Sequence, residues 1–77
     1  MNEAQYNRIR AAFEKRGGVF ASSPEIDEHL DRIGAEAATL NATTILVRQN
    51  YIPSASAMFE ELMHTTQYRT GRATGSN

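Results

Sequence analysis

The sequence contains no cysteine and no tryptophan, and only two prolines and one lysine among its 77 residues. Without cysteine the chain cannot form disulfides, and zinc or iron–sulfur sites built on thiolates are excluded. No apolar run approaches the ~18 residues that a membrane span requires, and the N-terminus lacks a signal-peptide pattern. Because Met1 is followed by polar Asn2 and Glu3, we expect a cytoplasmic protein without a membrane partner.

The net charge is only −1, which argues against a basic protein that coats nucleic acid. The charge is nevertheless unevenly distributed, with +2 over residues 1–22, −4 over residues 23–40 and +1 over residues 41–77. These charges either pair within the fold or meet a charged protein partner. The charged residues that we expect at such an interface are Arg8, Arg10, Asp27, Asp31, Arg48 and Arg69.

Three helices can be predicted from capping residues and apolar spacing. The first begins near Asn2 and ends before Gly17 and Gly18. The second has Ser23 as its N-cap and Pro24 in its first turn, and it ends at Gly34. The third runs from residues 53–54 to about residue 68.

Strands are expected between these helices. Residues 43–48 are rich in β-branched side chains, residues 37–40 can pair with them as a hairpin, and residues 19–21 can form an edge strand. The order α-β-α-β-β-α predicts a single α+β domain over residues 1–70, with a short antiparallel sheet covered by helices, and a flexible tail over residues 71–77. The predicted core consists of Ile9, Phe13, Ile26, Leu30, Ile33, Ile45, Val47, Phe59 and Leu62.

The third predicted helix carries Glu60, Glu61, His64 and Gln67. Side chains three or four positions apart share a helix face, so Glu60 and His64 lie one turn apart, with Glu61 on the adjacent flank. A carboxylate and an imidazole at this spacing can hold one metal ion, and the zinc peptidase motif His-Glu-x-x-His uses the same spacing, with its Glu as general base. The same pair on an exposed helix can equally form a simple ion pair.

A catalytic zinc takes about three protein ligands, so a third would have to come from elsewhere in the chain. Glu28, His29 and Glu36 are the candidates. Two carboxylates on one helix also require a nearby cation, and we expect Arg48, or an arginine of the first helix, to form a salt bridge with one of them. Glu36, which is flanked by alanines, is expected to be a buried partner for an arginine.

Three segments, residues 32–37, 44–48 and 54–69, together resemble the C-terminal domain of phage minor head (MuF-like) proteins and of some bacterial polymorphic toxins. That family carries a Glu-Glu-x-x-His-x-x-Gln element, which residues 60–67 match, and the resemblance covers roughly residues 8–72. It implies a zincin-like scaffold with Glu60 and His64 as metal ligands and Glu61 as general base. Domains of this family continue beyond the position of Asn77 into a further acidic helix. We therefore expect either a truncated relative or a site that a partner completes.

Two hypotheses of different classes follow from the residues and the resemblance. In the first, the chain is a phage- or prophage-derived, non-catalytic interaction protein on a truncated zincin-like scaffold, for instance an inhibitor of a host enzyme or defence system in the bacterial cytoplasm. In the second, it is a zinc-dependent hydrolase, a metallopeptidase-like toxin domain with Glu60 and His64 as ligands and Glu61 as base. Zinc is the expected cofactor of the second hypothesis, and the first needs none.

Overall fold

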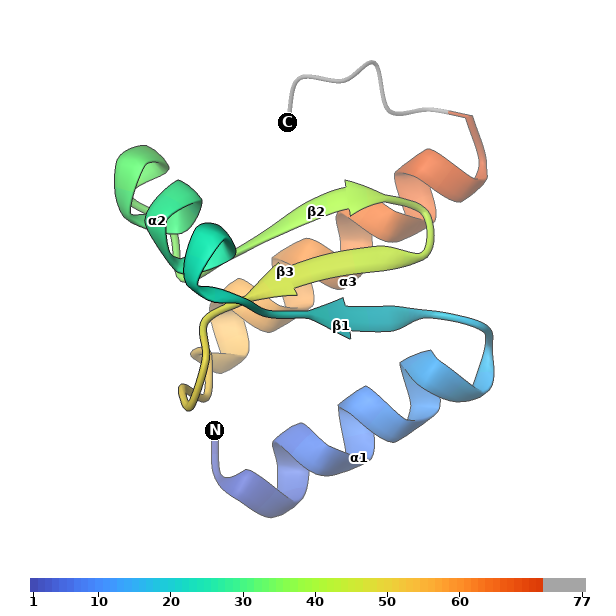
Figure 1. The fold of residues 1–77 in the computed structure, drawn as a ribbon. Coiled ribbons are helices and arrows are strands. Elements are labelled where there is room, and N and C mark those ends of the chain that lie inside the picture. Colours follow the sequence, from blue (N-terminus) through green and yellow to red (C-terminus); the bar gives the residue numbers. More distant parts are fainter. Residues whose placement is uncertain (72–77) are drawn as a thin grey trace.

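The computed structural model describes residues 1–71, which form three helices and three strands (Figure 1). The elements are α1 (Glu3–Lys15), β1 (Val19–Ala21), α2 (Pro24–Ile33), β2 (Ala37–Asn41), β3 (Thr44–Val47) and α3 (Ala55–Arg69). The predicted α+β class and element order are therefore confirmed. Apart from Gly71, the predicted tail lies outside the described residues. In the described part of the chain, no helix has both the length and the apolar character to cross a membrane.

Each helix begins at a capping residue that the sequence predicts. Asn2 caps α1 through a capping box, because its side chain accepts from the Gln5 N–H while the Gln5 side chain accepts from the Asn2 N–H. Ser23 and Ser54 each accept from the backbone N–H three positions further on, at the starts of α2 and α3. These bonds satisfy amide groups that the first turn of a helix otherwise leaves unpaired.

The sheet has the strand order β1-β3-β2 and is mixed, whereas the sequence predicted an antiparallel sheet. β2 and β3 form the predicted antiparallel hairpin, with Ala37 opposite Val47 and Thr39 opposite Ile45. β1 joins the other side of β3 in parallel, with Phe20 opposite Ile45. The difference arises because α2 and β2 lie between β1 and β3 in the chain. β2 runs antiparallel to β3, so β3 runs in the same direction as β1.

α1 and α3 contribute to a single core on one face of the sheet. Alternate residues of β3, Ile45 and Val47, are buried there, whereas Leu46 between them is half-buried. The core cluster consists of Tyr6, Phe13, Phe20, Ala37, Ile45, Val47 and Met58. α2 lies at the end of the sheet where β2 begins and β3 ends (Figure 1), and its Leu30 is fully buried outside that cluster.

The predicted core is correct in part. Ile33 and Phe59 were expected to be buried, and both predictions are wrong, because these side chains are 52% and 61% exposed. Ile33 is the last residue of α2, and Phe59 lies to one side of the buried face of α3, where it lines an open pocket with Met1 and Ile9. Of the other predicted core residues, Phe13, Leu30, Ile45 and Val47 are buried, and Ile9, Ile26 and Leu62 are half-buried.

Candidate functional site

One face of α3 rests on the sheet, and the flank of that face borders the edge strand β2. Met58, Glu61 and Thr65 are the buried residues of α3, at the spacing of a single helix face. Glu60 and His64 lie on the flank and line a pocket of about 260 Å³ together with Glu61 and residues of β2. The fold thus brings Glu60, Glu61 and His64 together at one pocket, as their spacing predicts.

Glu61 is held against β2 by Thr39. The Thr39 Oγ1 atom lies 2.8 Å from the Glu61 Oε1 atom and 2.9 Å from the Glu61 carbonyl oxygen. Because a hydroxyl group has one proton, the carboxylate and the carbonyl share it. The side chain of Glu61 is therefore held on the strand side of the pocket, whereas Glu60, on the flank of the helix, is exposed.

His64 is oriented by a neighbour on its own helix. Its Nδ1 atom lies 2.9 Å from the Gln67 Oε1 atom. An amide oxygen only accepts hydrogen bonds, so in this arrangement Nδ1 is the donor, and in the neutral imidazole Nε2 is then the nitrogen with the lone pair. Metal-binding histidines are commonly oriented by such a bond from the nitrogen that does not bind the metal. Gln67, predicted only as a continuation of the same helix line, thus has a positioning role toward His64.

The described residues do not bring together the three protein ligands that a catalytic zinc site takes. Within residues 1–71, no three His, Cys, Asp or Glu side chains lie close enough together to hold a metal ion. Glu28 pairs with Arg32 at 3.4 Å. Glu36 bonds to Ser54 and lines a pocket of about 320 Å³ with Glu60 and Glu61, but the three carboxylates do not form a group that could hold a metal ion. His29, the third candidate, is a half-buried residue of α2. On their own, these residues do not fit a catalytic zinc, which takes about three protein ligands.

Arg48 does not neutralise the carboxylates of α3, and that prediction is wrong. Its Nη1 atom lies 2.6 Å from Asp31 Oδ1, and its Nη2 donates to the Ala35 carbonyl oxygen at 3.0 Å. The reason is the alternation of a strand: Val47 points into the core shared with α3, so the next side chain points to the other face, toward α2. Arg48 therefore links the end of β3 to the end of α2.

Most of the charged residues expected at an interface make contacts within the fold. Asp31 pairs with Arg48, and Asp27 accepts from the backbone N–H of Gln49 at 3.1 Å. Arg10 lies 3.5 Å from Glu14, and its guanidinium sits over the ring of Phe20. These contacts agree with the alternative that the opposite charges pair inside the molecule. The two others line separate pockets, Arg8 beside the start of α3 and Arg69 at its end.

Glu36 has a role that the sequence did not predict. Its carboxylate accepts from the Ser54 backbone N–H, the Ser54 hydroxyl and the Tyr51 hydroxyl, each at 2.9 Å, and so fixes the start of α3. The bonds from Ser54, more than the weaker effect of Tyr51 and of Arg48, lower the pKa of the Glu36 carboxyl. The same carboxylate raises the pKa of the Tyr51 hydroxyl, which donates to it. The expected arginine partner is thus replaced by hydroxyl and amide donors.

Comparison with protein-family models, with curated proteins and with solved structures finds no match to this chain. The resemblance to the phage minor head domains therefore stays a prediction that rests on the three sequence segments. The chemistry of the pocket and of the surfaces around it is therefore the basis for a proposed function.

Proposed function

We propose that the chain is a protein-interaction domain that binds an extended segment of a protein partner along the outer edge of β2. The observation that carries this proposal is the strand order β1-β3-β2, which leaves β2 paired on one side only within residues 1–71. An unpaired strand edge presents backbone N–H and C=O groups, and extended peptides add to such edges through main-chain hydrogen bonds. An inhibitor of a host enzyme would act in this way if it bound an extended segment of that enzyme.

Apolar side chains on and beside this edge strand support the proposal. Leu40 of β2 is 56% exposed, and Ile33, which lines the pocket next to β2, is 52% exposed. Large apolar side chains that are left open beside a free strand edge provide contact area for a bound segment. Leu40 and Ile33 can therefore contact alternate side chains of an extended partner segment.

The charge of the pocket specifies the chemistry of that partner. The ion pairs among the described residues join Arg10 to Glu14, Arg32 to Glu28 and Arg48 to Asp31, so they leave out the carboxylates of Glu60 and Glu61. Both carboxylates line the pocket beside β2. An arginine or lysine of the bound segment would be attracted there, and this complementarity would fix the register of the segment on the strand.

Peptide titrations test the proposal. Extended peptides of about ten residues with a central arginine are titrated into the ¹⁵N-labelled chain, alongside the same peptides with a central glutamate. We expect saturable amide shifts at residues 37–41 with the arginine peptides only. The variant Glu60→Lys should weaken this binding about tenfold or more, whereas Glu28→Lys, an equal charge change on α2, should not. Equal binding of both peptide sets, or shifts confined to other elements, contradicts the proposal.

A zinc-dependent hydrolase is a second candidate, and the orientation of His64 favours it. In the neutral imidazole the bond from Nδ1 to Gln67 leaves the lone pair on Nε2, and Glu60 and Glu61 line the same pocket. If a third ligand came from outside residues 1–71, Glu60 and His64 would hold the zinc, and Glu61 would take a proton from water. The bound metal would supply Lewis acidity toward a carbonyl group.

Zinc titration by calorimetry separates the two candidates. The hydrolase requires one zinc per chain at micromolar concentration, loss of binding in His64→Ala, and binding about tenfold or more weaker in Gln67→Ala. Zinc binding that is absent, or that survives His64→Ala, removes a hydrolase that this chain would form without a partner. The peptide titration, performed without zinc, judges the interaction domain independently.

A further inference from the structure

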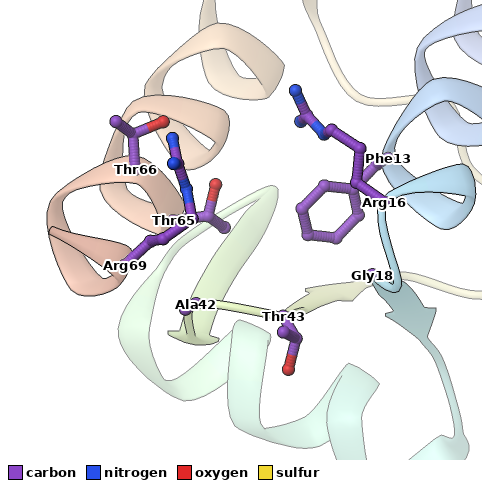
Figure 2. Close-up of a pocket in the computed structure, with 8 residues that line it drawn as sticks. All are labelled: Phe13, Arg16, Gly18, Ala42, Thr43, Thr65, Thr66 and Arg69. Atoms are coloured by element: carbon purple, nitrogen blue, oxygen red, sulfur yellow. The ribbon is translucent and has the colours of Figure 1, made fainter.

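A second pocket lies between the C-terminal ends of α1 and α3 and the turn that joins β2 to β3 (Figure 2). Its volume is about 280 Å³, close to the lower end, about 300 Å³, of pockets that hold small molecules. Arg16 lies on the α1 side, Thr66 and Arg69 lie on the α3 side, and Thr43 comes from the turn. The open edge of β2 contributes no residue to it.

The lining of this pocket is positively charged. It includes Arg16 and Arg69 and no aspartate or glutamate. The ion pairs within residues 1–71 engage other arginines, so neither guanidinium in this pocket is neutralised by a described carboxylate. Figure 2 shows the two guanidinium groups rising on opposite sides of the hollow, with the hydroxyl groups of Thr65 and Thr66 beside Arg69. Two cations that face one space attract an anion into it.

The wall on the α1 side is rigid. The Arg16 guanidinium carbon lies 6.0 Å from the centre of the Phe13 ring, at the outer limit of a cation–π contact. Phe13 is only 4% exposed, and its ring packs edge-on against Phe20 with centroids 5.5 Å apart. Gly18 lets the chain pass close to this ring, because a Cβ atom there would come within 2.4 Å of it. Arg16 is therefore attached to a fixed surface.

The positive charge of the pocket exceeds what is needed to offset the partial negative charges at the C-terminal ends of α1 and α3. A helix C-terminus has about half a negative charge, and basic residues in the last turn offset it. Lys15 in α1 and Arg69 in α3 already do so. Arg16, the C-cap of α1, adds a further full positive charge, so the mouth of the pocket remains positive.

We infer that this pocket binds a phosphate group, either as inorganic phosphate or as the terminal phosphate of a nucleotide. Guanidinium groups present several N–H donors in a planar fork that matches the oxygens of a phosphate, and two of them can bind it from two sides. The Thr66 hydroxyl makes only a long bond of 3.3 Å to the Leu62 carbonyl oxygen, which it can exchange for a phosphate oxygen. The size of the pocket suits a phosphate group with part of a small molecule outside it.

Titration of the ¹⁵N-labelled chain at low salt tests the inference. Inorganic phosphate and adenosine monophosphate are added separately, and low salt limits the screening of exposed charges. We expect saturable shifts at Arg16, Gly18, Thr43 and Thr66, with a Kd of about 1 mM or tighter. Tighter binding of adenosine monophosphate identifies a nucleotide, and equal binding identifies free phosphate as the ligand. If neither saturates below about 10 mM, the inference is wrong.

Matched variants separate a built pocket from general positive charge. Arg16→Gln and Arg69→Gln should each weaken phosphate binding about tenfold, because each removes charge-assisted hydrogen bonds. Lys15→Gln removes the same charge from the same end of α1 without touching the pocket, and it should change the Kd less than about twofold. An equal loss in Lys15→Gln would overturn the inference. Since Arg16 also contacts Phe13, Arg69→Gln remains decisive if Arg16→Gln unfolds the chain.

Discussion

Thr39 hydrogen-bonds through one hydroxyl group to both the carboxylate and the main-chain carbonyl of Glu61, and so joins the edge strand β2 to the helix α3. Each of the two residues is 8% exposed. A buried carboxylate without a partner is costly, so the presence of Glu61 on the sheet-facing side of α3 depends on Thr39. The candidate site therefore shares a residue with the packing of the fold.

Replacing Thr39 by valine should destabilise the chain by about 1–3 kcal/mol, because Glu61 loses its hydroxyl partner. Urea unfolding measures this difference. Thr39→Ser, which keeps the hydroxyl, should recover most of the loss. The double variant Thr39→Val with Glu61→Leu should be closer to the wild type than Thr39→Val alone, since neither polar group then lacks a partner. A double variant that is as unstable as the sum of the single changes would show that the bond has little energetic weight.

Leu30→Ala should cost on the order of 2–5 kcal/mol, because the side chain is fully buried and its removal leaves a cavity. For a chain of this size such a loss can unfold the protein. Ile33→Ala, on the same helix but 52% exposed, should change the free energy of unfolding by less than about 1 kcal/mol. Thermal melts of both variants check the pair, and similar melting temperatures would contradict the burial of Leu30.

The pH dependence of stability should carry a contribution from Glu36. Folding lowers the pKa of its carboxyl from the ordinary value of 4.5, so the contribution is complete above that value and disappears as the pH falls through the lower folded pKa. Glu36→Gln should therefore be less stable than the wild type at neutral pH, and the difference should shrink in acid. Denaturant unfolding across pH measures it. A difference that stays constant into acid would show that the charge of Glu36 contributes nothing.

Gly18→Ala should destabilise the chain by about 1–3 kcal/mol through overpacking. The new Cβ atom would come within 2.4 Å of the Phe13 ring, which is buried and cannot move away without displacing Phe20. Phe13→Leu combined with Gly18→Ala should cost less than the two single changes together, because the smaller side chain gives room to the methyl group. Additive losses in denaturant unfolding would indicate that the two positions do not compete for space.

Local chemistry made the elements predictable. The caps Asn2, Ser23 and Ser54 mark helix starts whose bonds form within three residues, so the signal is complete in a short segment. The hairpin is likewise a contact between neighbours in the chain. The parallel pairing of β1 depends on where α2 and β2 return the chain, and no local pattern encodes that.

The orientation of α3 was harder to predict, because apolar residues occur on several of its sides. The apolar pattern does not identify which face is buried, because Met58, Phe59, Leu62 and Met63 are spread around the helix. The face that rests on the sheet also includes Glu61. Thr39, the hydrogen-bond partner of Glu61, is 22 positions away in the sequence, so the pattern of the helix alone predicts Phe59 as a core residue. The spacing of Glu60, Glu61 and His64 was sufficient to place them at one pocket, because helix geometry is local.

The parallel pairing of β1 with β3 also has a consequence for the order of assembly. Residues 19–21 are synthesised before residues 44–47, so β1 has no partner strand until β3 has been made. The hairpin closes through a short turn, whereas β1 must close a loop that contains α2 and β2. Phe20 and the aromatic side chains of α1 remain without the sheet that buries them during this interval. Of the two pairings in the sheet, the one made by β1 therefore has the longer loop to close.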